Sequence, residues 1–138
     1  MLPNIPVTGG GETTVALALK YGSKIGVLGI TDYAPQAYRR MIPDQMILGR
    51  PEGVHSTLDL MTPEGKESVL KLGLKLKEQG AEVIALACTG LATIGIAKDL
   101  ENETGLPVID PVMAEGLFAY FEYLRKKYAV RKVAKICY

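Results

Sequence analysis

The chain has 138 residues, of which 48% are hydrophobic and 22% are charged. This balance is typical of a globular protein, and the length fits one domain rather than two ordinary lobes. No apolar run approaches the roughly 18 residues that a membrane span needs, and the first residues lack the features of a secretory signal. Two cysteines do not make a disulfide framework. We expect a cytoplasmic protein with free thiols and no membrane partner.

The net charge of +1 is unevenly distributed along the chain. Six of the 16 basic residues and none of the acidic ones follow Leu124, which leaves 10 basic against 15 acidic residues elsewhere. A basic tail can attract nucleic acid or a membrane surface. The simpler interpretation, which we favour, is a helix end whose cations suit the C-terminal dipole, followed by a solvated tail. No RNA-binding signature accompanies the charge, so we expect no nucleic-acid partner.

Short apolar runs alternate with helical patterns. The runs cover residues 5–7, 24–30, 46–48, 83–87 and 106–109. The two clearest, 25–30 and 83–87, are apolar throughout, as expected of strands covered on both faces. Strands that alternate with helices predict an α/β fold, a three-layer lobe with a parallel sheet between two layers of helices.

The spacing of apolar residues and the residues that begin or end a helix predict where the helices lie. We expect helices around residues 15–19 and over 34–41, a loop over 49–61, and a helix that begins after Thr62 and ends at Gly80. Another helix follows Cys88 and stops at Gly105. The last helix begins after Asp110 and presents an apolar face made of Met113, Leu117, Tyr120, Phe121 and Leu124. We expect the tyrosines to be mostly packing residues on such helix faces.

A short internal echo suggests a repeat. The segment N-I-P-V at residues 4–7, followed by a turn and a helix, resembles G-L-P-V at residues 105–108 in its own context. The echo is short enough to arise by chance. If it is a repeat, residues 1–22 are the tail end of a first repeat, 23–128 an α/β domain that carries the Cys88 loop, and 129–138 a basic C-terminal tail.

The stretch A-L-A-C-T-G-L at residues 85–91 places a cysteine at the carboxyl end of a buried strand and directly before a helix. Backbone N–H groups and the partial positive charge of a helix start favour a thiolate at such a position. Gly90 lets the backbone approach a ligand, and Thr89 offers a hydroxyl and an N–H group to a carboxylate. The alternative is that Cys88 is a small buried hydrophobic residue.

Ligands of parallel sheets bind beyond the carboxyl ends of the strands. Besides the Cys88 loop, the residues expected there are Thr8, Gly9, Thr31 and Asp110, which we predict to bind substrate. Simpler interpretations remain open, since Thr31 fits an ordinary turn and Asp110 before a proline fits a helix N-cap. His55 is interpreted as a loop residue. No ligand cluster accompanies His55 and Cys88, so we expect no metal.

The segments V-I-A-L-A-C-T-G-L-A-T-I-G and L-E-N-E-T-G-L-P-V-I-D-P-V resemble the second half of the aspartate/glutamate/hydantoin racemases, and hydantoin racemases most closely. The upstream segments I-P-V-T-G-G-G, K-I-G-V-L-G-I-T and G-V-H-S-T-L-D-L-M-T are also similar to that family, so the resemblance covers residues 4 to about 120. It implies one of two pseudo-symmetric α/β lobes, no cofactor, and a small carboxylate, amino acid or hydantoin as substrate.

The resemblance also implies a mechanism in which the thiolate of one lobe removes the α-proton and the thiol of the other lobe returns one to the opposite face. Cys88 then has the second-lobe role, with Thr89 and Gly90 in its oxyanion and carboxylate site. The thiol loop of the first lobe would precede residue 5, where the chain does not contain it. Cys137 lies in the basic tail without a strand or glycine turn before it. Racemisation would therefore need a thiol from a homo-oligomer or from a missing first lobe.

Two other functions stay open. Arylmalonate decarboxylases look similar and protonate an enediolate with a single second-lobe cysteine, which makes a one-cysteine decarboxylase or isomerase an alternative. The chain could also be a non-catalytic relative that binds a small carboxylate or forms an oligomer.

Overall fold

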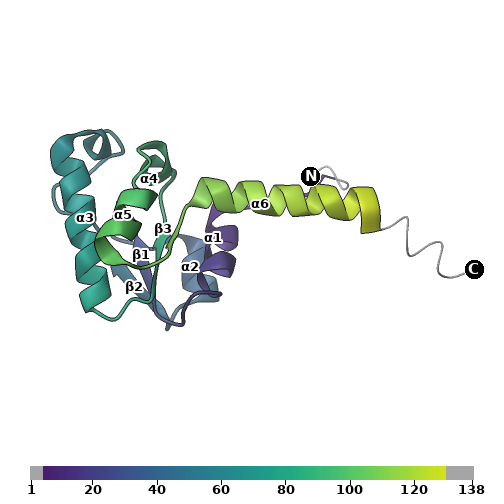
Figure 1. Cartoon of the computed structure of the whole chain (residues 1–138), viewed down its shortest axis with the longest axis horizontal. Helices are drawn as coiled ribbons and strands as arrows, with labels where there is room; N and C mark the ends of the chain where they lie inside the picture. Colours follow the sequence, from purple (N-terminus) through teal and green to yellow (C-terminus); the bar gives the residue numbers. More distant parts are fainter. Residues whose placement is uncertain (1–4, 130–138) are drawn as a thin grey trace, which may run out of the picture.

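A parallel sheet of four strands forms the middle of the molecule (Figure 1). The computed structural model describes residues 5–129, so Cys137 and the tail from residue 130 lie outside the described part. The strands are β1 (Ile25–Leu28), β2 (Met46–Gly49), β3 (Val83–Leu86) and β4 (Val108–Ile109), arranged in the order β2-β1-β3-β4. All neighbouring pairs are parallel, as the sequence predicts.

Helices cover both faces of the sheet, so the predicted three-layer α/β fold is confirmed. One layer contains α1 (Gly10–Ala18), α2 (Gln36–Met41) and α6 (Pro111–Leu124), and the other contains α3 (Pro63–Glu78), α4 (Thr89–Thr93) and α5 (Ala97–Thr104). Alternation along β1 separates two cores, because Ile25 and Val27 pack with the first layer and Leu28 packs with the second. A 3₁₀ turn, η1 (Asp59–Met61), precedes α3, and a π-helical turn, η2 (Arg125–Ala129), follows α6.

The helix α3 begins and ends where its capping residues predict. The Thr62 side chain accepts a hydrogen bond from the Gly65 N–H at 3.0 Å, and Pro63 occupies the first helical position. Gly80 follows the helix with φ of 99°, a conformation that glycine adopts without strain. The buried stripe along the helix contains Val69, Leu72, Gly73 and Leu76.

Two predicted elements differ in the structure. The single helix expected after Cys88 is divided into α4 and α5 by Gly95, whose φ of 67° cannot continue an α-helix. Residues 5–7, expected as a strand, are exposed and belong to no strand. Pro6 lacks an N–H for a ladder, and none of the described strands pairs with this segment.

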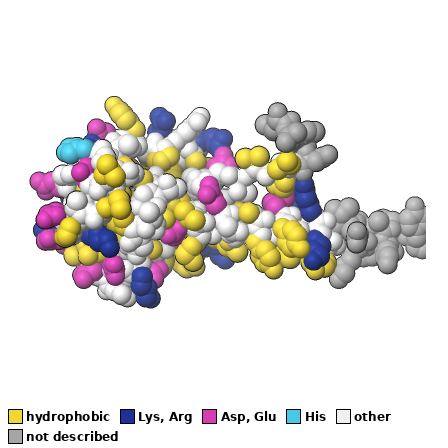
Figure 2. All heavy atoms as spheres, turned by 90° about the horizontal axis from the view of Figure 1, so that it is seen from above, with side chains coloured by type: hydrophobic (Ala, Val, Ile, Leu, Met, Phe, Trp, Pro, Cys, Tyr) yellow, Lys and Arg dark blue, Asp and Glu magenta, His cyan; other side chains and the backbone are white. Residues whose placement is uncertain are grey.

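The face of α6 that the sequence marks as apolar faces outward, which corrects the expectation that it packs. Pro111 and Ala114 are the buried residues of this helix. Figure 2 shows hydrophobic side chains gathered on the arm that α6 forms beside the body of the domain. Tyr120 and Tyr123 are exposed there, and among the described tyrosines only Tyr38 is buried. None of the helices within residues 5–129 is long and apolar enough to cross a membrane.

Candidate active site around Cys88

The carboxyl ends of β1 and β3 form the topological switch point of the sheet. From β1 the chain moves outward to β2 on one side, and then returns to add β3 and β4 on the other side. Ligands of open α/β sheets bind in the crevice at this point. Gly29 and Ala87 face each other just beyond the two strands, since a Cβ built on Gly29 would lie 3.8 Å from the Cβ of Ala87. Cys88 follows immediately, and so the thiol belongs to this crevice.

A pocket of about 150 Å³ surrounds the thiol. Its walls come from the starts of α1 and α6, from α2 and from the end of β3, and consist of Gly10, Gly11, Pro35, Tyr38, Leu86, Ala87, Cys88, Thr89 and Pro111. Cys88 is half-buried in this wall. Cys88 also packs against the second core, so the residue stands between that core and the pocket.

Backbone N–H groups at the start of α4 stand beside the cysteine. Cys88 is the N-cap residue of this helix and makes no side-chain cap hydrogen bond. The Leu91 N–H is already bonded to the Cys88 carbonyl at 3.1 Å. The N–H groups of Thr89 and Gly90 have no helical acceptor, because they open the first turn. Two donors next to the thiol can therefore bind an oxygen atom of a ligand.

Gly90 also has a packing role, beside the predicted contact with a ligand. A Cβ at this position would lie 2.9 Å from the Thr57 Cγ2 atom and 3.3 Å from the Leu60 Cδ1 atom. The small residue therefore lets the loop over residues 50–60 lie against the thiol loop. This close contact fixes the start of α4 from the side of the second core.

Tyr38 forms part of the pocket wall. Its hydroxyl donates a hydrogen bond to the Leu86 carbonyl at 3.4 Å. In the β3–β4 register, that carbonyl would accept the N–H of residue 111, which is a proline and has none. Burial raises the pKa of the Tyr38 phenol, and the nearby Thr14 hydroxyl opposes this to a smaller extent. Tyr38 therefore stays a neutral donor that satisfies the strand end two residues before Cys88.

Gly10 and Gly11 form another part of the pocket wall. Gly11 packs closely on α2, since a Cβ there would lie 3.0 Å from the Cβ of Ala37. A Cβ on Gly10 would lie 2.9 Å from the Oε1 atom of Glu115. Both glycines therefore bring the backbone of α1 up to the pocket, where side chains would not fit.

The other predicted contacts lie outside this pocket. Thr8 and Gly9 line a separate hollow beside Met41 and Phe118. The Thr31 hydroxyl donates to the Tyr33 carbonyl at 2.8 Å, which is an ordinary turn. The Asp110 carboxylate caps α6, accepting the Val112 N–H at 2.8 Å and the Met113 N–H at 3.1 Å.

His55 lies on the exposed loop over 50–60, as predicted, in a polar cluster. Its Nδ1 atom lies 2.8 Å from the Arg50 Nη2 atom, and Arg50 also pairs with Asp32 at 2.7 Å. These contacts tie the chain after β1 to the chain after β2. They orient the loop that packs on Gly90.

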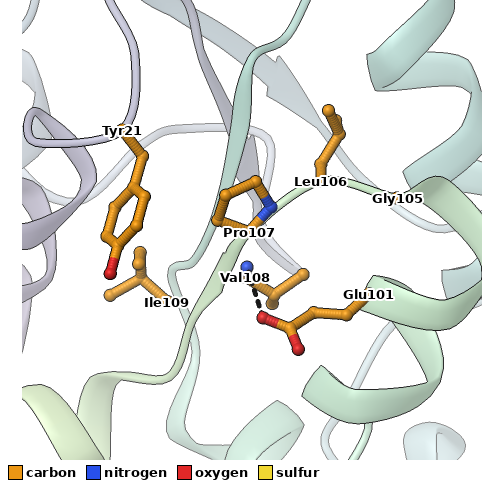
Figure 3. Close-up of a pocket in the computed structure, with 7 residues that line it drawn as sticks. All are labelled: Tyr21, Glu101, Gly105, Leu106, Pro107, Val108 and Ile109. Atoms are coloured by element: carbon orange, nitrogen blue, oxygen red, sulfur yellow. Dashed lines mark hydrogen bonds between the residues drawn. The ribbon is translucent and has the colours of Figure 1, made fainter.

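A second hollow of about 360 Å³ lies at the start of β4, away from the switch point (Figure 3). The Glu101 carboxylate accepts the Val108 N–H there at 3.2 Å, which satisfies the outer edge of the strand. Tyr21 and Pro107 stand nearby. None of the residues that line this hollow carries a thiol.

Comparison with known proteins agrees with the fold. The Asp/Glu/Hydantoin racemase family model matches residues 1–115. A hydantoin racemase of Paenarthrobacter aurescens is 37% identical over 53% of this chain and 27% of its own length. A hydantoin racemase of Pseudomonas sp. (strain NS671) is 27% identical over 83% of this chain and 48% of its own length.

A solved structure of the same kind is also similar. The crystal structure of allantoin racemase from Pseudomonas fluorescens superposes with a TM-score of 0.72 at 28% identity, covering 91% of this chain and 55% of that chain. The chain thus spans about half the length of the solved relative and no more than about half of the two hydantoin racemases. With the family model matching most of its residues and the same α/β lobe in its fold, the chain belongs to the Asp/Glu/hydantoin racemase family.

Proposed function

We propose that the chain is the Cys88-bearing half of a cofactor-independent racemase that acts on hydantoins or related amino-acid derivatives. The observation that carries this proposal is the position of Cys88, a half-buried thiol in a pocket at the switch point. The family and the names of the relatives, hydantoin and allantoin racemase, support the reaction class. A free thiol also fits the reducing cytoplasm, where we expect the protein.

In this proposal the Cys88 thiolate takes the proton from the α-carbon of the substrate. The electron pair of the broken C–H bond moves toward the neighbouring carbonyl and gives a planar enolate. The N–H groups of Thr89 and Gly90 donate to the oxygen that gains charge, which lowers the barrier. Thr8, Gly9, Thr31 and Asp110 remain predicted contacts for parts of the substrate beyond the pocket.

Inversion of the α-carbon needs a second acid–base group on the opposite face of the enolate. Cys88 is the only thiol in the lining of the described pocket. We propose that the second group comes from another polypeptide, either a first lobe or a second copy. The greater length of the relatives supports this requirement.

Deuterium exchange tests the proposal. A 5-substituted hydantoin is incubated in heavy water near neutral pH, and proton NMR follows the α-proton signal. We expect the wild-type chain to accelerate its loss and the Cys88→Ala variant to return the rate to that of buffer. The matched variant Cys137→Ala should retain the wild-type rate. Equal rates with wild type and Cys88→Ala would remove Cys88 from the reaction.

Two other outcomes would point to the alternative functions. Release of carbon dioxide from an arylmalonate without α-exchange of the product would indicate a one-cysteine decarboxylase. Ligand binding that survives Cys88→Ala without turnover of any substrate would indicate a non-catalytic small-carboxylate-binding protein.

A further inference from the structure

A row of apolar side chains follows the outer face of α6. Its members are separated by four, three and four residues. We call them the α6 seam, which consists of Met113, Leu117, Tyr120 and Leu124. Met113 is 74% exposed, Leu117 54% and Tyr120 59%. This spacing is typical of a helix that packs lengthwise against another helix. Within residues 5–129, the first three side chains of the seam are exposed and Leu124 is half-buried.

The seam carries no charge along its length. The charged residues between Pro111 and Leu124 are Glu115 and Glu122, and both are half-buried toward α1. Glu115 lies against Gly10, and Glu122 lines the hollow shared with the start of α1. An apolar hollow of about 400 Å³, lined by Leu117, Phe118 and Phe121, lies alongside. It can take a side chain from a partner helix.

Opposite charges flank the two ends of the seam. Asp110 stands directly before the first turn of α6, and the basic π-helical turn η2 follows its last turn. Lys127 belongs to a basic turn with Arg125 and Lys126. Two parallel copies would bring these basic turns together. Two antiparallel copies instead place the acidic end of each helix at the basic end of the other, and the helix dipoles also oppose.

We propose that the α6 seam is a two-fold symmetric docking surface for a second copy of this chain, with the two helices antiparallel. Met113 of each copy then lies opposite Leu124 of the other, and Leu117 opposite Tyr120. The basic turn η2 of the second copy then comes beside Asp110, one residue from Pro111 in the wall of the Cys88 pocket. The pairing thus places the last turn of one α6 at the edge of the active site of the other copy. The inference goes beyond the proposed racemase activity and does not depend on it.

Light scattering after size exclusion tests the surface. We expect the wild-type chain to have twice the mass of one chain at micromolar concentration. Leu117→Asp should weaken dimerisation by at least about tenfold, because it buries an unpaired charge at the seam. The matched control Leu58→Asp changes a side chain that is 72% exposed on the loop before η1 and should leave the dimer intact. Circular dichroism confirms folding, and Tyr120→Glu serves as a second seam variant.

A monomeric wild-type chain, or a dimer that Leu117→Asp and Tyr120→Glu leave unchanged, would overturn the proposal. If the wild-type chain is monomeric, the seam would instead bind another protein. The first candidate is a polypeptide that corresponds to the half of the longer relatives that this chain does not span. Neither result bears on deuterium exchange by Cys88, so this inference and the proposed function fail separately.

Disulfide trapping tests the orientation. Chains carrying Met113→Cys and chains carrying Leu124→Cys, both with Cys88→Ser and Cys137→Ser, are mixed and oxidised, one kind bearing a tag. The antiparallel pair predicts mixed disulfides between the two kinds. Bonds only between like chains, or no bonds at all, would overturn the antiparallel arrangement.

Discussion

At the scale of single residues, two absent groups shape the surroundings of Cys88: the backbone N–H that Pro111 lacks and the Cβ atom that Gly90 lacks. Pro111 has no N–H for the Leu86 carbonyl, and the Tyr38 hydroxyl takes that place. Gly90 has no Cβ, and so the loop with Thr57 can lie against the start of α4. These contacts help to hold the strand end and the helix start between which Cys88 lies.

Removal of the Tyr38 hydroxyl should destabilise the fold modestly. Tyr38→Phe leaves the buried Leu86 carbonyl without a hydrogen-bond donor. The lost hydrogen bond is long, at 3.4 Å, so we expect the free energy of unfolding to fall by only about 1 kcal/mol. Urea unfolding of wild type and variant measures the difference. Tyr33→Phe, at a side chain that is 78% exposed, is the matched control and should change nothing measurable. A Tyr38→Phe variant as stable as wild type would show that the hydroxyl does not hold the strand end.

The same residue should make the fold sensitive to alkali. Burial raises the pKa of Tyr38, so above the ordinary tyrosine pKa of about 10 the unfolded chain releases a proton that the folded chain keeps. The stability of the wild type then falls as pH rises, and Tyr38→Phe lacks this loss. The difference in unfolding free energy between the two proteins should therefore shrink between about pH 9 and pH 11. A constant difference would contradict the burial of a neutral phenol.

At the scale of elements, side chains from one element hold the ends of others. The Glu82 carboxylate, just before β3, accepts the Ser23 N–H at 2.6 Å and the Lys24 N–H at 3.0 Å, just before β1. It aligns the starts of the two central strands. Their carboxyl ends, where Cys88 lies, inherit this alignment through the register Ile25 to Val83.

The Glu82 contact should be lost in acid. The hydrogen bonds from the Lys24 and Ser23 backbones hold the pKa of Glu82 below its ordinary value of 4.5. A lowered pKa means stability that is present above pH 4.5 and is lost as pH falls through the folded-state value. Unfolding free energies of wild type and Glu82→Gln should therefore converge between about pH 5 and pH 3. For the control Glu78→Gln, on the exposed end of α3, the difference in unfolding free energy from wild type should not change over this pH range. A constant difference for Glu82→Gln as well would contradict the contact.

The cap of α3 should contribute measurably to stability. Thr62→Ala removes the acceptor for the Gly65 N–H and should cost about 1 kcal/mol in urea unfolding. Thr62→Ser keeps the hydroxyl and should stay close to wild type. If both variants lose the same stability, the methyl group rather than the cap is responsible.

At the scale of the whole molecule, the periodicity of apolar residues and the positions of capping and turn residues predict most of the fold. Continuous apolar runs predict β1 and β3, and the Thr62 and Gly80 signals bound α3, because these are local properties of the chain. The outward apolar face of α6 could not be predicted, since apolar spacing does not say which partner covers a helix. In the site, position after a buried strand predicts Cys88 and Thr89. Tyr38 and Pro35 come from a distant helix and have no local signal.

The most direct test of the account follows deuterium incorporation and optical rotation together, using each enantiomer of a 5-substituted hydantoin separately in heavy water. One thiol reaches only one face of the α-carbon. The account therefore predicts that one chain acting alone exchanges the α-proton of one enantiomer with its rotation retained. Both enantiomers exchange where a second polypeptide supplies the other acid–base group, and Cys88→Ser abolishes the exchange in either case. Exchange of both enantiomers at the rate of buffer alone, or exchange that persists in Cys88→Ser, would contradict the assignment of Cys88 as the proton-transferring group.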